Sequence, residues 1–248
     1  MIHTRAAMGL LALTFTVAGC SKDARTDEAV KTKTSTGDSA TSMSSDAAES
    51  RNVALVRVVN AVPASPTLIV RSDSLHMLPG VAFKEVTPFQ PVDKAWVKFE
   101  VGGGPGGAYS TLAADRAMLT DGNRYTMLIM RDKAGTGYDT RVLKDNVSAD
   151  TTQAHLRIVH AAVGFESVSL VAKGGAALAD GVKFESGSDF KDVIPFTGTV
   201  EVRSEKGNQL LLSVPDVAMG AGVASTIVLT RSGKGKLEAF WFVDKPIR

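Results

Sequence analysis

The chain has 248 residues, of which 44% are hydrophobic and 22% are charged, with 28 basic and 26 acidic side chains. A chain of this length allows one large or two medium domains. Because the basic and acidic residues nearly balance, the chain lacks the excess of positive charge that binds DNA or RNA, which excludes a nucleic-acid partner. The single cysteine, Cys20, excludes an internal disulfide and a cysteine-based metal cluster.

The first 20 residues have the features of an export signal. Arg5 lies near the start, a mostly apolar run covers residues 6–18, and Gly19-Cys20 follows. This run is too short to span a bilayer comfortably. Val17-Ala18-Gly19-Cys20 resembles the lipobox of bacterial lipoproteins. The resemblance implies that residues 1–19 are removed as a signal peptide and that Cys20 carries a diacylglyceryl group.

An ordinary leader or a short anchor helix remains the alternative for this segment. Several acyl chains on Cys20 would attach the protein durably to a membrane. Ser21 follows the cysteine where an aspartate would signal retention. By resemblance to the enterobacterial sorting rule, this implies the outer membrane rather than the inner one. The expected location is therefore the bacterial cell envelope, facing the periplasm or the exterior.

Residues 20–51 are predicted to form a lipid-anchored, disordered linker. Ser, Thr, Asp, Ala and Lys dominate this segment, and aromatic residues are absent from it. Such a composition cannot bury enough apolar surface to offset the entropy of ordering. As a flexible coil of about 30 residues, the linker would hold the folded part roughly 30 Å from the lipid on average.

After the linker, the chain is predicted to form about seven strands. Val53–Val59 is a β-branched run too short for a helix, which predicts a strand. In Trp96–Val101 polar and apolar residues alternate, so we expect Val97, Phe99 and Val101 to face the core. The best helical candidate, Leu112–Leu119, is short. The further strand-like segments are Thr67–Arg71, Val81–Phe83 with Phe89, Tyr109–Met118, Tyr125–Met130 and Thr140–Lys144.

The same plan then recurs about 100 residues later. Leu55–Ala61 returns as Leu156–Ala161, and Arg57 and Arg157 are 100 positions apart. The matching segments are Leu156–Ala162, Val168–Ala172, Val182–Phe184 with Phe190, Thr199–Arg203, Leu210–Leu212, Ser225–Thr230 and Leu237–Val243. Short strands with turn signals every 8 to 12 residues predict an all-β fold of two tandem Ig-like β-sandwiches, at residues 52–149 and 150–248.

Several of these sequence segments resemble the DUF4397 family. The resemblance rests on Arg57-Val-Val-Asn-Ala61 with Pro63 and Pro66, and on a Leu-x-x-Gly-x-x-Tyr-Thr phrase at Leu119–Thr126. It implies tandem β-domains in a secreted or lipid-anchored bacterial protein, and the family has no assigned activity. His160 matches a histidine of the family's opening phrase, which Asn60 replaces in the first copy.

One glycine-rich motif invites a cofactor interpretation. Gly102, Gly104 and Gly107 fit the G-x-G-x-x-G pattern of dinucleotide sites. Such a site needs a helix to begin at the loop, and the β-like sequence that follows predicts none. We therefore expect a hairpin loop and no cofactor.

The remaining candidates are isolated polar and aromatic residues. His155 and His160 lie five apart in one strand and so on opposite faces, which excludes a shared metal ion. Asn60 and His160 are expected to orient backbone groups at their strand ends, and they remain weak candidates for ligand binding. Trp96 and Trp241 are candidate stacking platforms for sugar, with packing inside the protein as the alternative.

Carboxylates offer no catalytic pair in this prediction. Asp145 and Asp244 fall at equivalent strand ends but in separate copies. We therefore predict no catalytic residue, no metal site and no enzyme. The expected function is a lipid-anchored envelope protein that serves as a binding or structural module, with an unknown envelope protein or glycan as partner.

The alternative is an envelope enzyme or glycan-binding protein with a site at the interface of the two domains. A binding module predicts an exposed aromatic or apolar patch. An enzyme predicts a cleft with converging polar groups of perturbed pKa. A purely structural role predicts open sheet edges.

Overall fold

A computed structural model describes residues 53–73, 76–92, 95–103 and 109–244, and the fold below is that of these residues. They form β-strands joined by turns and loops, with no helix among them, as the sequence predicts. None of them therefore forms a helix long and apolar enough to cross a membrane. The predicted leader, the linker and Cys20 lie outside the described residues.

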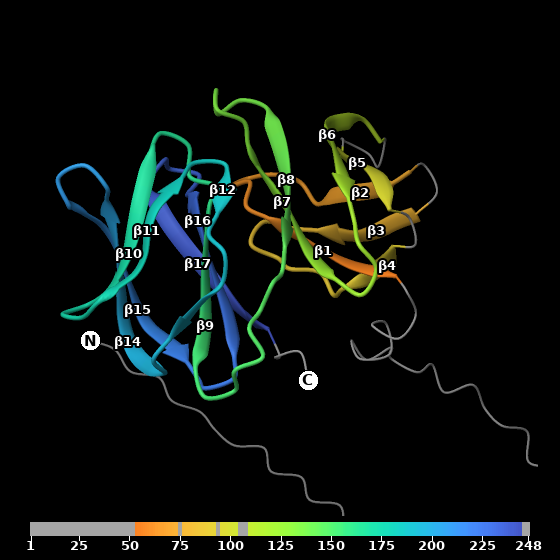
Figure 1. The fold of residues 1–248 in the computed structure, drawn as a ribbon. Coiled ribbons are helices and arrows are strands. Elements are labelled where there is room, and N and C mark those ends of the chain that lie inside the picture. The colour runs from red at the N-terminus through yellow and green to blue at the C-terminus, as the bar shows by residue number, and fades with distance from the viewer. Residues whose placement is uncertain (1–52, 74–75, 93–94, 104–108, 245–248) are drawn as a thin grey trace, which may run out of the picture. The chain divides into compact units, whose positions relative to one another are not determined.

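The first half folds into a sandwich of two four-stranded sheets (Figure 1). One sheet has the order β4-β1-β7-β8 and the other β3-β2-β5-β6. Their facing residues share one buried core, to which Val58 and Ile129 contribute from one sheet and Phe99 from the other. The strands are β1 (Ala54–Asn60), β2 (Leu68–Ser72), β3 (His76–Val81), β4 (Gln90–Val92), β5 (Trp96–Gly102), β6 (Thr111–Met118), β7 (Arg124–Arg131) and β8 (Tyr138–Lys144).

The second half repeats this strand order. Its sheets are β12-β9-β16-β17, with β13 also paired to β9, and β11-β10-β14-β15. Val200 and Val202 point into its core, as the alternation predicts. The strands are β9 (Ala154–His160), β10 (Ser167–Ala172), β11 (Ala177–Lys183), β12 (Ser186–Gly187), β13 (Lys191–Val193), β14 (Phe196–Ser204), β15 (Leu210–Met219), β16 (Ala224–Arg231) and β17 (Leu237–Asp244).

Successive residues of β1 and β9 are buried on opposite faces of their sheets. In each half the first strand pairs in parallel with the next-to-last strand, β1 with β7 and β9 with β16. Val58 and Ile158 face the core of their own sandwich, whereas Val59 and Val159 face a third core that both halves share. This double burial explains why apolar residues occupy both faces of each strand, so that a strict alternation of apolar and polar residues is absent.

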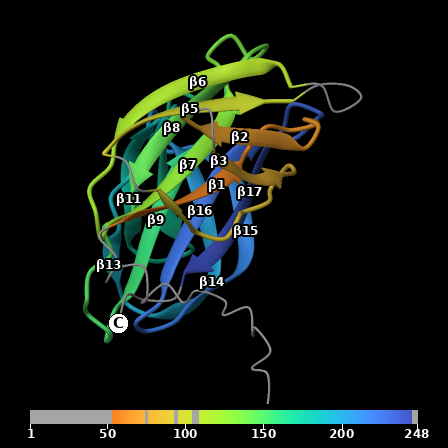
Figure 2. The same ribbon diagram turned by 90° about the vertical axis from the view of Figure 1, so that its right-hand side faces the viewer.

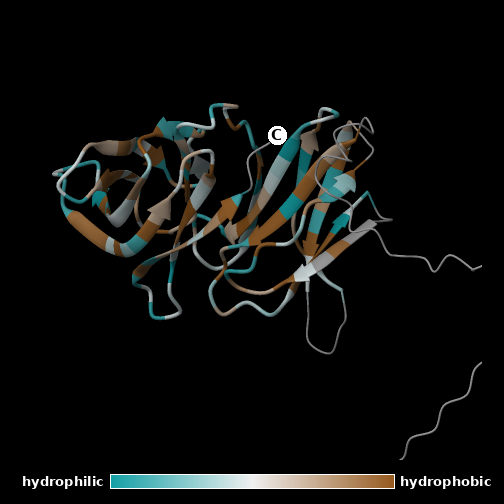
Figure 3. Ribbon diagram, turned by 90° about the horizontal axis from the view of Figure 1, so that it is seen from below, coloured by the Kyte–Doolittle hydropathy of each residue, from teal (hydrophilic) through white to brown (hydrophobic). Residues whose placement is uncertain are grey.

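The third core joins the two sandwiches sheet to sheet. Leu128 and Met130 of β7 meet Val159 and Val228 from the second half in this core. Thr230 Oγ1 donates a hydrogen bond of 2.6 Å to the carbonyl oxygen of Ala61 across the same contact. Bands of brown (hydrophobic) and teal (hydrophilic) residues follow one another along the strands (Figure 3). The two sandwiches therefore belong to one compact unit.

The predicted element at Val81–Phe83 is wrong in its bounds. The third strand ends at Val81, and the chain then turns at Lys84, which has a φ of 67°. The second half does the same, with β11 ending before Glu185, at a φ of 62°. A positive φ departs from the extended conformation of a regular strand, and at Lys84 and Glu185 the chain turns. The two turns instead bring the amides of Lys84 and Glu185 to the carbonyl oxygens of Asn60 and His160.

Other expectations are confirmed by the strand assignments. Val97, Phe99 and Val101 are buried, with Trp96 and Lys98 exposed on the other face. The best helical candidate is instead extended, since all of it except Leu119 lies within strand β6. Gly102, the first glycine of the motif, ends β5, whose antiparallel partner is the next strand, β6. Gly104 and Gly107 themselves are outside the described residues.

Two neighbouring residues of β7 test the shared core. Leu128 lies in the core between the sandwiches, and Ile129 lies in the core of the first sandwich. We expect Leu128→Ala and Ile129→Ala each to lower the free energy of unfolding by about 2–5 kcal/mol, because both leave a cavity. Urea denaturation followed by circular dichroism measures this. Exposed Met118→Ala is the control, and a Leu128→Ala effect as small as the control's would contradict the sheet-to-sheet contact.

Candidate functional site

Four charged residues meet in the contact between the sandwiches. Arg57 of β1 and Arg157 of β9 are 3% and 1% exposed, at the same position of the repeated strand phrase. Asp145 follows β8, and Asp244 is the last residue of β17. The strand ends that the sequence places in separate copies thus come together here. Although Asp145 and Asp244 belong to different copies, both carboxylates bond the guanidinium of Arg57.

Asp145 lies between both arginines. One of its oxygens accepts a hydrogen bond of 2.7 Å from Arg157 Nη1, and the other accepts one of 3.1 Å from Arg57 Nη2. Asp244 binds the same Arg57 guanidinium through both carboxylate oxygens. Thr126 Oγ1 donates to Asp145 at 2.8 Å and accepts from Arg57 Nε at 2.9 Å. Two positive and two negative charges therefore balance in the buried cluster.

Aromatic rings complete the surroundings of the two guanidinium groups. Arg57 lies 4.6 Å from the ring centroids of both Phe89 and Phe242, and Arg157 lies 4.5 Å from that of Phe190. Burial lowers the pKa of the Arg157 guanidinium, while the Asp145 carboxylate raises it and favours the charged form. An arginine remains protonated under these conditions. The two guanidinium groups therefore act in the cluster as fixed positive charges that the carboxylates neutralise.

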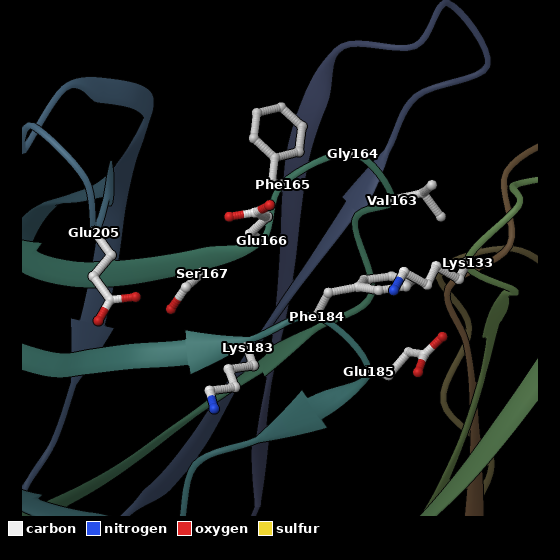
Figure 4. A pocket seen from close by; sticks show the side chains of 10 residues that line it. All are labelled: Lys133, Val163, Gly164, Phe165, Glu166, Ser167, Lys183, Phe184, Glu185 and Glu205. Carbon is white, nitrogen blue, oxygen red and sulfur yellow. The ribbon is translucent and has the colours of Figure 1, made fainter.

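A pocket of about 720 Å³ opens at the second sandwich (Figure 4). Phe165, Phe184 and Glu185 line it from the second half, and Lys133 of the β7–β8 hairpin lines it from the first. Its walls combine aromatic rings with charges of both signs. Some of these charges are already paired, since Glu185 contacts Arg141 of β8 at 3.3 Å.

His160 lies behind this pocket and is itself fully buried. Its Nε2 lies 3.1 Å from the carbonyl oxygen of Phe165, and its Nδ1 lies 3.3 Å from the amide nitrogen of Ala162. A carbonyl only accepts and an amide N–H only donates, so the ring is neutral with its proton on Nε2. Its edge meets the ring of Phe184 at a centroid distance of 5.9 Å.

Asn60 occupies the corresponding place in the first sandwich. Its Oδ1 accepts from the Val62 amide at 2.9 Å, and its Nδ2 donates to the carbonyl oxygen of Val81 at 3.1 Å. Both residues thus bond backbone groups at the ends of their strands, as the sequence suggests. Their ring or amide atoms are buried, so in this structure neither is presented to a ligand.

The other sequence candidates lie apart from the pocket. Trp96 is 68% exposed on the outer face of β5. Trp241 is half-buried and packs against the core of the second sandwich. His155 lies on the opposite face of β9 from His160 and contacts Asp192 at 2.7 Å. In the described part of the chain, no three His, Cys, Asp or Glu residues are arranged to hold a metal ion.

Comparison with known families adds one finding. A DUF4397 domain, a domain of unknown function, is found at residues 54–171. The match covers the first sandwich and continues through β9 into β10 of the second. No curated protein matches the chain.

The charge cluster is the feature that sequence reasoning missed. A signal for it was present, because each copy places an arginine in the middle of an apolar, β-branched strand. A buried charge needs a partner of opposite sign. Asp145 and Asp244, at the ends of the last strands, were the matching acidic residues.

Neutralising one carboxylate tests the cluster. Asp145→Asn leaves two buried guanidinium groups with one carboxylate, so we expect it to lower the free energy of unfolding by about 3–5 kcal/mol. Asp139→Asn is the matched control, because Asp139 pairs with Arg141 at the surface of β8. That pair is worth at most about 1 kcal/mol. Equal effects of the two substitutions in urea denaturation would contradict the buried cluster.

His160 predicts a dependence of stability on pH. Burial lowers its pKa to about 4, and the Phe165 carbonyl opposes that shift. Between pH 6.5 and 4 the unfolded chain therefore binds a proton that the folded chain does not. Stability should fall as the pH drops through this window, by about 3 kcal/mol in total from this one group.

The variant His160→Asn isolates this effect, because Asn60 already performs the equivalent role. We expect the variant to fold at pH 7 and to lose less stability than the unsubstituted protein between pH 7 and pH 4.5. Urea denaturation at the two pH values measures the difference. Identical losses in both proteins would show that His160 does not carry the dependence.

Proposed function

We propose that this protein is a lipid-anchored, non-catalytic binding module of the bacterial cell envelope, built from two tandem DUF4397-like sandwiches. Cys20, at the end of an apolar leader, supplies the anchor, and residues 20–51 form the linker to the sandwiches. The outer membrane is the expected location.

The observation that carries the binding role is the exposed apolar pair of Trp96 and Met118. These side chains are 68% and 62% exposed, and the two residues are cross-strand partners at the ends of β5 and β6. A side-by-side tryptophan and methionine at the surface is what a binding module predicts. The buried cluster supports the same role, because it holds the two sandwiches as one frame for that surface.

The pocket supports a second candidate function, the binding of a small polar ligand such as a glycan. Lys133 of the first sandwich and Glu185 of the second line this pocket together with the ring of Phe184. An aromatic ring beside polar groups suits a sugar. A glycan array that compares the unsubstituted protein with Phe184→Ala tests this candidate.

The anchor is tested by metabolic labelling with radioactive palmitate in a bacterial host. We expect the unsubstituted chain to take up label and to fractionate with the envelope. Cys20→Ala should take up none, because the thiol is the acceptor of the diacylglyceryl group. Absence of label from the unsubstituted chain would refute lipid anchoring.

A further inference from the structure

The outer face of β5 and β6 carries two neighbouring pairs of unusual composition. Trp96 is paired with Met118, and the next pair on the same face is Lys98 with Arg116. Cross-strand partners on one face are close enough to interact, and two like charges placed opposite each other weaken a sheet. Folding alone therefore does not explain this arrangement. It suits a partner that accepts apolar and cationic groups side by side.

The charges on this face are only partly compensated. Lys98 Nζ contacts Glu100 at 2.5 Å, and the Lys98 amide donates to Asp73 Oδ1 at 3.2 Å. Within the described ranges, the guanidinium of Arg116 has no such ion pair. A recess of about 330 Å³ lies between Asp73, Trp96 and Arg116. Arg116 thus leaves a positive charge at the edge of a recess beside an exposed indole.

The second sandwich provides an internal comparison. Its buried Val200 and Val202 correspond to Phe99 and Val101, so its outer-facing positions can be read from the same alternation. None of the four side chains recurs there: the corresponding residues are Thr197, Thr199, Asp216 and Ala218. The repeated fold therefore does not require the apolar and basic pairs. They are specific to the first sandwich.

The position of this face relative to the chain start points to the partner. Val53, where the described chain begins, accepts a hydrogen bond of 3.0 Å from the amide of Gly122 in the β6–β7 turn. Leu119, next to Met118, donates one of 2.7 Å to the carbonyl oxygen of Ala95, next to Trp96. Val53 thus lies at the same end of the first sandwich as the exposed pair. Figure 2 shows β5 and β6 on the side turned to the viewer.

We infer that this face docks on the surface of the lipid bilayer to which Cys20 is attached, an inference that rests on the proposed anchor. Trp96 and Met118 enter the interfacial region, where tryptophan is the preferred aromatic residue. Arg116 contacts the phosphate groups of the lipid headgroups, and anionic lipid strengthens this contact. About 30 residues separate Cys20 from Val53, so a coil of that length, with a reach of roughly 30 Å, permits the contact.

Fluorescence quenching in vesicles tests the contact directly. The lipidated protein is reconstituted into phosphatidylcholine–phosphatidylglycerol vesicles that contain lipid with brominated acyl chains. In a Trp241→Phe background, Trp96 is the only tryptophan, and we expect its emission to shift to the blue and to be strongly quenched. The matched control is Trp241→Phe/Trp96→Phe/Thr197→Trp, which moves the reporter to the corresponding place in the second sandwich. Its emission should be unquenched.

Vesicle flotation of the chain from residue 20 with Cys20→Ser tests the same face without the anchor. We expect Trp96→Ala to lower its partition coefficient about tenfold, as for the loss of one large apolar side chain from an interface. Thr197→Ala should change nothing. Arg116→Ala should weaken binding to anionic vesicles at low salt and have a smaller effect at high salt.

The outcomes separate this inference from the proposed anchor. Palmitate on Cys20 together with an unquenched Trp96 would overturn the docking and leave the anchor standing. No palmitate, with flotation that depends on Trp96, would overturn the anchor and leave the docking standing. Binding of an acidic polysaccharide through Trp96 and Arg116, without flotation on vesicles, would overturn the docking in favour of a glycan partner.

Discussion

The structure depends on two arginines that cannot be paired within their own strands. Arg57 and Arg157 lie in the middle of β1 and β9, buried on the face that turns away from each sandwich's own core. A guanidinium in that position is strongly destabilising unless a carboxylate reaches it. Asp145 reaches Arg157 from the first half, and Asp244 reaches Arg57 from the second. Each half therefore neutralises a buried charge of the other. These ion pairs form only when the two inner sheets are aligned as they are in this structure.

The contact has the character of a symmetric dimer interface within one chain. Lys84 of the first half pairs with Glu238 of the second at 3.3 Å, and Glu185, which corresponds to Lys84, pairs with Arg141 of the first half at 3.3 Å. In a twofold interface the same surface patch of each copy contacts the other. Here the two equivalent turns differ in charge, because Lys84 is positive and Glu185 is negative. The opposite charges at these turns favour the pairing of unlike halves. The contact also leaves the outer sheets, which take no part in it, free to differ.

The proposed function depends on the outer sheet of the first sandwich. The inner sheets carry the repeated residues, whereas the outer sheet of the first sandwich carries Trp96, Met118 and Arg116 without counterparts in the second. Asn60 and His160, by contrast, occupy equivalent positions and have the same structural role. Both side chains bond backbone groups at the ends of their strands, although one is an amide and the other an imidazole. Buried polar groups need such partners, so their positions are explained by the fold alone.

The sequence by itself determined the β-class, most strands, the inward residues of β5 and β14, and the recurrence near 100 positions. These features follow from local periodicity and turn chemistry, which neighbouring residues specify. The sequence assigned Asp145 and Asp244 to separate copies, because packing between the sandwiches involves residues far apart in the chain. It extended the third strand to Phe83, because the hydrogen bond from the Lys84 amide to Asn60 also joins distant residues. Only the tertiary structure decided that β1 and β9 are buried on both faces and that the repeated arginines meet the two aspartates. The physical reason is that a buried charge selects its partner by proximity in space rather than in sequence.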